Sequence, residues 1–598
     1  MKRLLFILIS YCLSLTAVHA QSWLWGQYGK GYGIGQSITT DNRGDCYLSG
    51  LIPNDTVHFG TYTLMNSTVT NSPYSINFDA YLVKYNAKGS ILWAKQWYSL
   101  DTSDMDVVYS PATVAADDKG NVYLNANFPD TLLVGSYTII NNDGYQATCI
   151  AKYDSNGNLK WIKASRNSGN GSLTGSVGNQ ISSDNFGNVF LLGTGSYDTV
   201  HFDTSIVCYR KNVNANDFLV KYDSAGNVKW AKESIPHGGG GVVSYCMAND
   251  RFGNIYTAGG FGDTVQYGAN ILIDAFWGLY GDFEIVKWDS SGNVLWAKEA
   301  KKISNSCSGV GFGVTADRNG NVYACGDFIN TLIFGQDTVK DTVAGRQNFF
   351  VVKYDPNGNV IWAKQATILD SNYGWGAWSM SSDNHDHLYL SINGGFGKSK
   401  IAFGGDTLIF NDTSKNDGAS IIFKLDSNGK ALCGTIIPAG TGWATPGFRT
   451  PISSDTSGKY IYLGGTAGTP AIFGKDTVNP YCIPINHIQG RNCFPFVARW
   501  EACDSSIFQA VPEEQKPLGG VVVYPNPNNG SFTIALQNVN EPAQVEIYNM
   551  LGEKVQSEKL NANNARLEMT SPASGVYFYR VIQENGSFIG SGKFVIEK

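Results

Sequence analysis

Charge is scarce in this sequence, and neither sign is in large excess. Asp, Glu, Lys and Arg make up 16% of the 598 residues, and the net charge is −6. Because nucleic acids and anionic membranes are recognised by basic surfaces, this balance argues against both as partners. Beyond the first 20 residues no apolar run approaches the roughly 18 residues that a membrane-spanning helix needs. We therefore expect no transmembrane segment in the mature chain, which should be soluble once released.

Motifs that carry local catalytic chemistry are also missing. The chain has no Gly-x-Ser-x-Gly nucleophile motif and no Cys-x-x-Cys pair, and its 11 cysteines are scattered. The glycine-rich stretch that begins at His237 is similar to the oxyanion loop of esterases, but the chain lacks the nucleophile motif that such a loop accompanies. From these patterns we predict no catalytic residue, no cofactor-binding residue, no cofactor and no metal ligand.

The first 20 residues have the pattern of a secretory signal peptide. Two basic residues precede the apolar run 4–15, and small residues close the segment. Secretion would place the cysteines in an oxidising compartment, where we expect one disulfide involving Cys482, Cys493 or Cys503. The sequence leaves its pairing open.

A unit of about 66 to 76 residues recurs along most of the chain. Each copy contains the turn Asp-x-x-Gly-Asn, or a close relative, between two apolar segments. A second turn of the same kind follows, usually with Trp-Ala-Lys after it. The seven copies are anchored on Asp41, Asp117, Asp184, Asp250, Asp317, Asp383 and Asp455. A fixed period of this length indicates one supersecondary unit repeated.

The two turns in each copy predict two β-hairpins, and therefore four strands. Asp bonds to its own backbone two residues on, and Gly supplies the positive φ that closes a short loop. Several strands are apolar at successive positions, for example 349–352, which indicates that both faces are covered. Such sheets repeated radially describe an all-β, seven-bladed β-propeller. An open β-solenoid is the alternative, but its repeats are usually much shorter.

The two ends of the repeat region complement each other. Copy seven keeps its third strand at 497–501 but lacks a following strand of the Leu-Trp-Ala-Lys type. The segment Trp23–Gln27 resembles that missing strand and precedes the first copy. We predict that the N-terminal segment forms the outer strand of blade seven and closes the ring.

One position of the outer strand distinguishes the copies. Copy six carries Cys433 there, so we expect its outer edge to be less completely packed. Copies one and six also have long insertions, at 61–77 and 394–415, which should be loops projecting from one face or rim. The other copies with this strand carry Trp93, Trp161, Trp230, Trp296 and Trp362.

The composition changes after the last repeat. Residues 506–520 are polar and interrupted by Pro and Gly, which is typical of a linker. Residues 521–598 lack the repeat but alternate short strands with turns, which predicts a small β-sandwich. Together with the signal peptide at 1–20 and the propeller at 21–505, these segments divide the chain into four parts.

Three sequence patterns of the repeat match a known family. They are Asp-x-x-Gly-Asn-x-Tyr, Leu-Val-Lys-Tyr followed by Asn or Asp at 82–86 and 219–223, and Gly-Asn-x-x-Trp-Ala-Lys. In these the chain resembles the bacterial β-propeller repeat family called SBBP, over about residues 21–505. That resemblance implies a fold and no shared catalytic residues.

The last domain carries several ordered motifs, including Tyr-Pro-Asn-Pro at 524–527 and Ser-Gly-Val-Tyr-Phe at 574–578. In these it resembles the type A C-terminal sorting domain of the type IX secretion system of Bacteroidota. The resemblance implies that the type IX machinery is a partner, that the domain is commonly cleaved, and that the cargo is released or attached to surface lipopolysaccharide. The motif residues are Tyr524, Pro525, Asn526, Pro527, Gly530, Tyr548, Gly552, Gly575, Tyr577 and Lys593.

Two polar patterns could hold metal ions but have simpler explanations. Asp-x-Asn-Gly-Asn offers oxygen ligands to calcium, yet it lacks the later Glu of an EF-hand, and turn chemistry accounts for each residue. His385 and His387 lie where other copies form the hairpin turn, with no third ligand nearby in sequence. We expect turns in both cases.

Aromatic residues are the remaining candidates for function. An exposed Tyr or Trp ring can stack on a sugar, and the chain has 32 Tyr and 14 Trp. We single out Tyr373, Trp375 and Trp378, at the entry to copy six, as candidate ligand-stacking residues. These features favour a noncatalytic binding or adhesion module for glycan or protein. The alternative is a secreted lyase or hydrolase whose site is assembled from several blades at the channel mouth.

Overall fold

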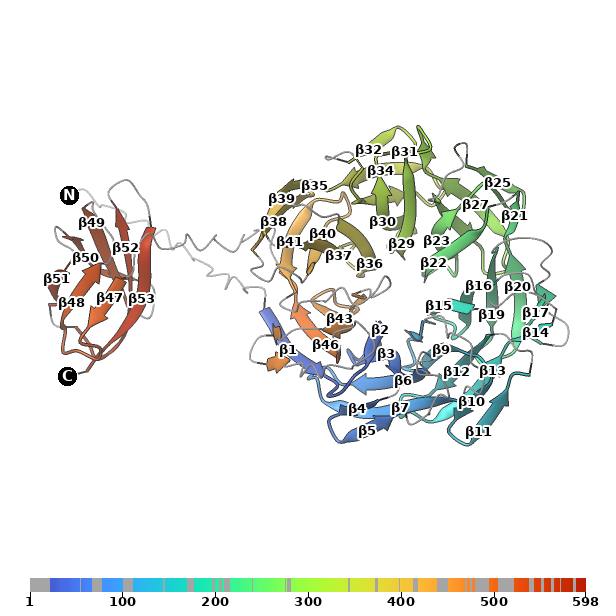
Figure 1. Ribbon diagram of the computed structural model, residues 1–598, viewed down its shortest axis with the longest axis horizontal. Helices are drawn as coiled ribbons and strands as arrows, with labels where there is room; N and C mark the ends of the chain where they lie inside the picture. The colour runs from blue at the N-terminus through green and yellow to red at the C-terminus, as the bar shows by residue number, and fades with distance from the viewer. Residues whose placement is uncertain are drawn as a thin grey trace, which may run out of the picture. The chain divides into compact units, whose positions relative to one another are not determined.

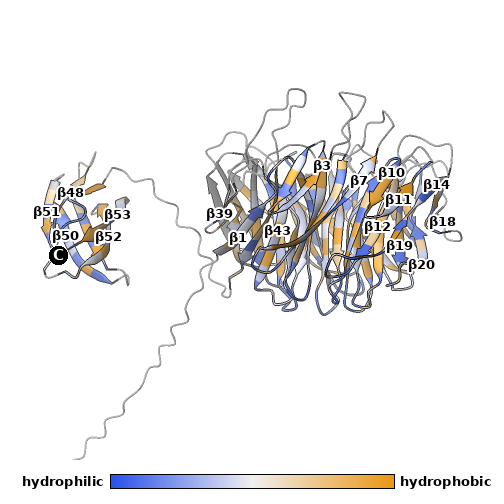
Figure 2. Cartoon of the chain, turned by 90° about the horizontal axis from the view of Figure 1, so that it is seen from below, coloured by the Kyte–Doolittle hydropathy of each residue, from blue (hydrophilic) through white to orange (hydrophobic). Residues whose placement is uncertain are grey.

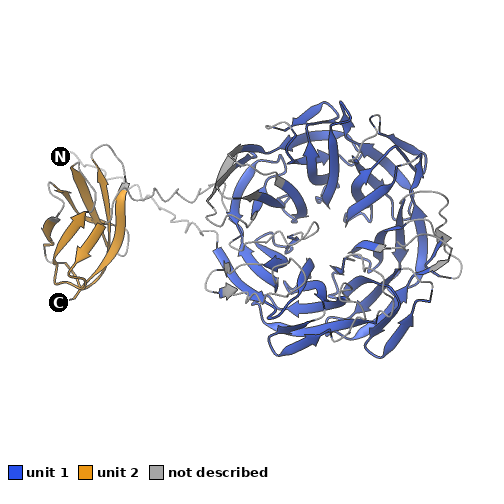
Figure 3. Ribbon diagram, viewed as in Figure 1, with its two compact units in different colours: residues 1–508 blue, residues 509–598 orange. Residues whose placement is uncertain are grey.

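The computed structural model describes most of the chain as β-structure. The described residues are 22–53, 55–66, 78–100, 111–142, 146–168, 177–195, 199–203, 207–208, 216–238, 240–274, 276, 281–341, 345–370, 375–396, 398–411, 418–437, 450–467, 471–473, 476–478, 494–503, 521–536, 542–549, 553–560, 564–570, 572–583 and 588–597. Within these ranges there are strands and no helix, which confirms the all-β prediction. The chain divides into two compact units, 1–508 and 509–598 (Figure 3). The predicted signal peptide and linker lie outside the described residues.

In its described part, the first unit contains seven antiparallel sheets built on one plan, numbered here from the N-terminus. Sheet 1 is β2 (Ile34–Thr40), β3 (Cys46–Pro53), β6 (Phe78–Tyr85) and β7 (Ile91–Leu100). Sheet 2 is β8 (Thr113–Ala116), β9 (Val122–Phe128), β12 (Ala147–Tyr153) and β13 (Leu159–Ala164). Sheet 3 is β15 (Val177–Ser183), β16 (Val189–Gly195), β19 (Asn216–Tyr222) and β20 (Val228–Glu233).

The remaining sheets repeat the same order of strands. Sheet 4 is β22 (Val242–Asn249), β23 (Ile255–Phe261), β26 (Asp282–Trp288) and β27 (Val294–Glu299). Sheet 5 is β29 (Ser308–Ala316), β30 (Val322–Ile329), β33 (Asn348–Tyr354) and β34 (Val360–Gln365). Sheet 6 is β36 (Trp375–Ser382), β37 (Leu388–Phe396), β40 (Gly418–Leu425) and β41 (Ala431–Ile436). Sheet 7 is β42 (Ile452–Ser454), β43 (Tyr460–Ala467), β46 (Phe494–Glu501) and β1 (Ser22–Tyr28).

The turns predicted from Asp and Gly connect these strands. In the turn of sheet 2, Asp117 Oδ1 accepts the backbone N–H groups of Lys119 at 3.0 Å and Asn121 at 2.8 Å. Gly120 has φ +77°, which the loop needs and which Gly adopts without strain. The same two contacts recur in copies one and three to six, so one short sequence sets the hairpin register there. The turn of copy seven is one residue longer, and Asp455 Oδ1 accepts from Ser457 Oγ and Tyr460 N.

The seven sheets follow one another around a ring (Figure 1). Their first strands lie on the inner side and contact each other in the order β2, β8, β15, β22, β29, β36, β42 and back to β2. Seven apolar clusters in the described part each combine residues of two consecutive sheets, including sheets 7 and 1. Apolar residues lie along the strands in Figure 2. The core is therefore divided among the boundaries between sheets, which we call junctions.

The last junction is closed by the N-terminal segment. Strand β1 pairs antiparallel with β46, with Gly26 opposite Ala498 and Gln27 opposite Val497. Trp25 Nε1 donates to Ala87 O of sheet 1 at 3.1 Å. The predicted pairing of the first strand with the last repeat is confirmed.

A tryptophan of the outer strand makes the same contact at five of the other six junctions. Trp93 Nε1 donates to Ser155 O of the next sheet, and Trp296 Nε1 donates to Pro356 O, at 3.2 and 3.1 Å. The Lys of the third strand donates to the same carbonyl, as Lys287 Nζ does to Pro356 O at 3.0 Å. Trp161, Trp230 and Trp362 repeat the bond to Ser224, Ser290 and Ser427.

At the junction of sheets 6 and 7 a disulfide replaces the tryptophan. Cys433 of β41 is bonded to Cys503, and Lys424 Nζ donates to Cys503 O at 3.1 Å. Cys433 is fully buried, so the expected looser packing at this position is wrong. The bond to Cys433 also answers the open question of which cysteine pairs with Cys503. Cys482 and Cys493 lie outside the described residues.

A second correction concerns the connections between the second and third strands. All seven contain a small hairpin, and the insertions expected to be loops contribute β5, β38 and β39. These hairpins are β4 (Thr56–Phe59) with β5 (Tyr62–Met65), β10 (Thr131–Val134) with β11 (Tyr137–Ile140), β17 (Thr199–His201) with β18 (Val207–Cys208), β24 (Thr264–Tyr267) with β25 (Asn270–Ile273), β31 (Thr331–Phe334) with β32 (Asp337–Lys340), β38 (Lys398–Phe403) with β39 (Asp406–Asn411), and β44 (Ala471–Phe473) with β45 (Asp476–Val478).

These hairpins link consecutive sheets. A short segment that follows the outer strand of one sheet pairs with the hairpin of the next, and β7 itself extends to pair with β10. The backbone hydrogen bonds therefore cross junctions as well as holding each sheet together. The linking segments are β14 (Arg166–Ser168), β21 (Ile235–His237), β28 (Lys301–Lys302) and β35 (Thr367–Asp370).

The second unit has two antiparallel sheets that share one apolar core. The four segments whose sequence predicts strands, 531–534, 544–548, 575–579 and 593–596, all lie in strands. The first sheet is β47 (Val521–Tyr524), β48 (Ser531–Leu536) and β51 (Asn564–Glu568). The second is β50 (Lys554–Leu560), β49 (Ala543–Tyr548), β52 (Gly575–Gln583) and β53 (Phe588–Ile596).

Candidate functional site

The innermost strands carry a β-bulge near their middle. The ladder between β22 and β23 shifts register between Ser244 and Cys246, which leaves Tyr245 as the extra residue. The same shift leaves Phe312 unpaired in β29 and Trp378 unpaired in β36. Each of these three side chains is half-buried, whereas the residue before it is buried. The bulges therefore display one side chain from each strand.

The displayed residues lie at the same place in the five copies whose innermost strand has this bulge, those of sheets 1, 3, 4, 5 and 6, five residues before the Asp of the turn. Sheets 1 and 3 have polar residues there. Gln36 Oε1 accepts the backbone N–H of Ala112 in sheet 2 at 2.8 Å. Asn179 Nδ2 donates to Thr194 Oγ1 at 2.7 Å and to Ser244 O of sheet 4 at 3.3 Å. In these copies the bulge residue is a polar bridge to the next sheet.

Sheets 4, 5 and 6 have aromatic residues at this position, and they form a row. The ring centroids of Tyr245 and Phe312 are 5.3 Å apart, with planes at 47°. Those of Phe312 and Trp378 are 4.5 Å apart and stacked at 29°. We call Tyr245, Phe312 and Trp378 the inner aromatic row. It is an apolar surface carried by three consecutive innermost strands (Figure 1).

Small residues and a carboxylate hold the row in place. Ala377 N donates to Asp327 Oδ1 of sheet 5 at 3.1 Å, which anchors the bulge of β36 to the neighbouring sheet. A Cβ at Gly376 would lie 2.6 Å from Asp327 Oδ1 and 2.8 Å from Trp378 Nε1. Only Gly at 376 leaves room for both the carboxylate and the indole.

Only one of the three predicted stacking residues has a described side chain. Trp378 is a member of the row. Tyr373 and the side chain of Trp375 lie outside the described residues. Sequence reasoning missed Tyr245 and Phe312, although their common offset from Asp250 and Asp317 is visible once the copies are aligned on the turn.

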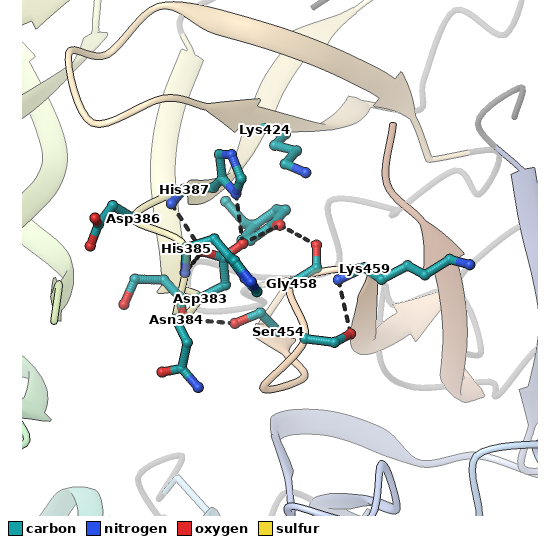
Figure 4. Close-up of polar contacts among 12 residues, drawn as sticks. Asp383, Asn384, His385, Asp386, His387, Lys424, Ser454, Gly458 and Lys459 are labelled. Atoms are coloured by element: carbon teal, nitrogen blue, oxygen red, sulfur yellow. Dashed lines mark hydrogen bonds and ion pairs between the residues drawn. The ribbon is translucent and has the colours of Figure 1, made fainter. Parts of the chain in front are cut away.

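The two histidines of copy six belong to a turn, as predicted (Figure 4). Asp383 Oδ1 accepts the backbone N–H groups of His385 and His387, at 2.7 and 3.0 Å. Asp383 Oδ2 lies 2.9 Å from both His387 Nδ1 and Tyr389 Oη. Burial raises the pKa of Asp383, but the hydrogen bonds from the His387 side chain and backbone outweigh it and lower the pKa to about 2.

His387 therefore replaces an Asn of the turn. In sheet 5 the equivalent Asn321 Nδ2 donates to Asp317 Oδ2 at 2.7 Å. Across the described ranges there is no group of three or more His, Cys, Asp or Glu placed to hold a metal ion. The carboxylate of each such turn is used by the turn itself.

In the second unit, the motif residues close one end of the sandwich. Asn526 Oδ1 accepts the backbone N–H of Val595, and Asn528 N donates to Val595 O, at 2.8 and 2.9 Å. Gly530 has φ +103°, and a Cβ there would lie 2.8 Å from the ring of Pro572. The peptide bonds before Pro525 and Pro527 are cis. Gly552 lies outside the described residues.

The outer face of the four-stranded sheet in this unit is polar. Glu546 accepts from Tyr548 Oη at 2.6 Å and from Lys554 Nζ at 3.1 Å, and it also accepts from Arg580 Nε. These bonds, the one from Tyr548 foremost, lower the pKa of Glu546 to about 2. Phe578, 45% exposed, lies on the same face beside Tyr548. The face offers both charge and an aromatic ring to a partner.

Residues 522–597 match a known family model, the secretion system C-terminal sorting domain. This sorting domain indicates export by the type IX secretion system, so the protein is secreted or lies at the outer-membrane surface. None of the described segments is a helix long and apolar enough to cross a membrane. No curated protein matches the sequence.

Solved structures give only distant likenesses. A fungal alcohol oxidase of the AA5 family, in complex with copper, is 11% identical with a TM-score of 0.36, over 97% of this chain and 100% of that one. A protein of unknown function from Bacteroides caccae is 11% identical with a TM-score of 0.28, over 59% and 88%. PorZ, a surface component of the type-IX secretion system of Porphyromonas gingivalis, is 10% identical with a TM-score of 0.13, over 96% and 100%. At these scores none supports a conclusion about the chain.

Proposed function

We propose that residues 21–505 form a seven-bladed β-propeller of the SBBP type, closed by β1 in its last blade. The ring of inner strands, the junction clusters and the pairing of β1 with β46 support this. The signal peptide at 1–20, the linker at 506–520 and the sorting domain at 521–598 complete the proposed domain organisation.

The propeller is the cargo, and the sorting domain is its export signal. Processing in the native host should leave an N-terminus at Gln21 and remove the sorting domain between about Asp504 and Val523, within the linker. The product is then released or attached to surface lipopolysaccharide. Intact-mass analysis of the secreted protein tests this, and a mature species that retains Lys598 would contradict cargo processing.

The propeller itself is a noncatalytic binding module for a glycan. The observation that carries this is the inner aromatic row. At the same position, Gln36 and Asn179 show that hydrogen bonds can bridge a junction. Three consecutive copies instead display half-buried aromatic rings, whose apolar surfaces suit the C–H faces of sugars.

A glycan array on the full mature chain tests this role. We expect bound glycans, and about a fivefold or larger loss of affinity in Trp378→Ala, since stacking contacts of this kind contribute about 1 kcal/mol or more. Gln36→Ala changes the same position of sheet 1 and should leave binding intact. Equal glycan binding by both variants, with both folded by circular dichroism, would contradict a role for the row. Binding of proteins but no glycan would contradict the ligand class.

A further inference from the structure

The seven Asp-x-x-Gly turns present one residue of each copy to solvent. We number each turn by its sheet. The exposed residue is the one two positions after the Asp of the turn. Every one of these side chains is exposed. They are Arg43, Lys119, Phe186, Phe252, Asn319, His385 and Ser457. Two consecutive turns therefore hold Phe where the other five hold polar residues.

Turn formation does not explain the two phenylalanines. Phe186 N donates to Asp184 Oδ1 at 3.0 Å, and Asn319 N makes the same bond to Asp317 at 2.9 Å. In these two turns the residue bonds to the Asp through its backbone N–H, so the turn does not require a phenyl ring. In turn 7 the side chain takes part as well, since Ser457 Oγ donates to Asp455. Phe186 is nonetheless 70% exposed and Phe252 is 58% exposed. Apolar rings held in water at two adjacent copies indicate a surface that is covered by a ligand.

The two turns lie side by side. Ser182, two residues before turn 3, donates through Oγ to Asn249 Oδ1, one residue before turn 4. The ring of Phe252 rests against the next turn, because a Cβ at Gly320 would lie 3.3 Å from it. Gly at position 320 therefore keeps Phe252 in place while most of its ring faces solvent.

Cations flank the phenylalanines. The Arg251 guanidinium lies 4.9 Å from the centroid of the Phe252 ring. Lys119 holds in turn 2 the position that Phe186 holds in turn 3, and the two turns are neighbours because Tyr123 Oη donates to Gly187 O at 3.3 Å. Within the described part of the chain neither Lys119 nor Arg251 forms an ion pair, whereas Arg318 is paired with Asp386 at 2.9 Å. The Asp118 carboxylate, next to Lys119 in sequence, accepts from Asn42 Nδ2 at 3.0 Å. In a chain with a net charge of −6, these are locally available positive charges.

We propose that Phe186 and Phe252, flanked by Lys119 and Arg251, form a second binding surface that takes an anionic polysaccharide. The two Phe rings receive the apolar faces of the sugars, and the two cations pair with carboxylate or sulfate groups. This surface lies at the turn end of the inner strands, away from the inner aromatic row in mid-strand. It rests on the repeat comparison and not on the function of that row.

Affinity electrophoresis of the full mature chain through gels containing polygalacturonate or chondroitin sulfate tests the proposal. Dextran is the neutral control polymer. We expect both acidic polymers to retard the protein, less so at higher salt, and dextran to have no effect. Retardation by dextran to the same degree, or no retardation by either acidic polymer, would overturn the proposal.

Variants separate this surface from the rest of the molecule. Phe186→Ser with Phe252→Ser introduces the residue that turn 7 already carries, so it should fold, and we expect at least a tenfold loss of affinity. Lys119→Ser with Arg251→Ser should weaken binding and flatten its salt dependence. Asn319→Ser, at the same position of turn 5, should bind as the wild type does. Wild-type binding by the double Phe variant, with an unchanged melting temperature, would overturn the assignment.

Discussion

Two junctions of the ring solve one packing problem in different ways. Between sheets 4 and 5, Trp296 donates to Pro356 O and packs between the rings of Tyr256 and Tyr354, with centroids 6.1 and 6.0 Å away. Between sheets 6 and 7, Cys433 takes the place of the tryptophan and is covalently bonded to Cys503. The Lys contact to the carbonyl of the next sheet is kept in both.

The difference coincides with the end of the repeats. In sheet 5 the carbonyl that Trp296 contacts belongs to a turn that continues into the next strand, β34. In sheet 7 the described part of this unit ends at Cys503, and the outer strand is supplied by β1, near the N-terminus. The noncovalent tryptophan contact is found where the outer strand of the next sheet follows directly in the chain. The disulfide is found where that outer strand comes from the N-terminal segment.

The largest effect should come from removing the closing strand. Deletion of residues 22–29 takes away Trp25 and leaves β46 as an unpaired apolar edge, which is a common route to aggregation. We expect a lower melting temperature and association of the mature protein in size-exclusion chromatography. Deletion of 521–598 is the control and should leave the ring folded. A monomer with unchanged melting temperature after the first deletion would contradict the closure.

Loss of the tryptophan contact should come next. Trp296 is 7% exposed, so Trp296→Ala should lower the free energy of unfolding by roughly 3–5 kcal/mol, the usual cost of deleting a buried large aromatic. Trp230, at the equivalent position of sheet 3, is more exposed, so Trp230→Ala should lower the free energy of unfolding by less. Denaturant titration of both variants measures the difference. If the free energy of unfolding changed by less than about 1 kcal/mol in Trp296→Ala, the ring would not contribute to the stability of the junction.

Loss of the disulfide should be somewhat smaller. The bond closes a loop over a sequence separation of 70, and removing such a bond usually costs about 2–4 kcal/mol. We expect this decrease in Cys433→Ala with Cys503→Ala, and a similar decrease in the wild type under reducing agent. The double variant is its own control, since reducing agent should not destabilise it further. Cys433→Trp combined with Cys503→Ala should recover part of this loss of stability, if a tryptophan can make at this junction the contact that it makes at the others.

The sequence predicted those features that repeat with the period. Trp25 could be matched to Trp93 because both precede a copy of the same turn, and so the closing strand was found. A disulfide involving Cys503 was among those expected, but its partner stayed open because Cys433 lies in a different copy, and the approach of the two depends on the ring and not on local pattern. The small hairpins were missed because strands as short as 199–201 carry little periodic signal.

The candidate site was predicted only in part, for a related reason. Trp378 was singled out from its aromatic neighbours in sequence, whereas Tyr245 and Phe312 are isolated aromatics in otherwise ordinary strands. Their role depends on a bulge in each strand and on contact between copies 66 or 67 residues apart, neither of which a local motif records. Alignment of the copies by their offset from the turn would have brought the three together.

The junction of sheets 3 and 4 has the tryptophan contact and, in addition, a buried polar cluster. Ser244 Oγ lies 2.5 Å from Asp217 Oδ2 and 3.0 Å from Glu284 Oε1, and Tyr267 Oη donates to Glu284 Oε2 at 2.6 Å. The Ser hydroxyl has one proton and can donate to only one of the two carboxyl groups. Because Asp217 Oδ2 also accepts from Ser244 N at 2.8 Å, we expect the hydroxyl proton to lie toward Asp217 and Glu284 to be the carboxyl group that holds a proton of its own.

Burial, reinforced by the charge of Asp217, raises the pKa of Glu284 to about 8. A raised pKa in the folded state means that the unfolded chain releases the proton first. Stability from this group is therefore complete below about pH 4.5 and declines up to about pH 8. In Glu284→Gln the amide keeps both bonds without titrating, so this variant should be more stable than the wild type at pH 8 and match it more closely at pH 5. Urea titrations at the two pH values measure this difference, and a parallel pH dependence of both proteins would show that Glu284 is ionised in the folded state.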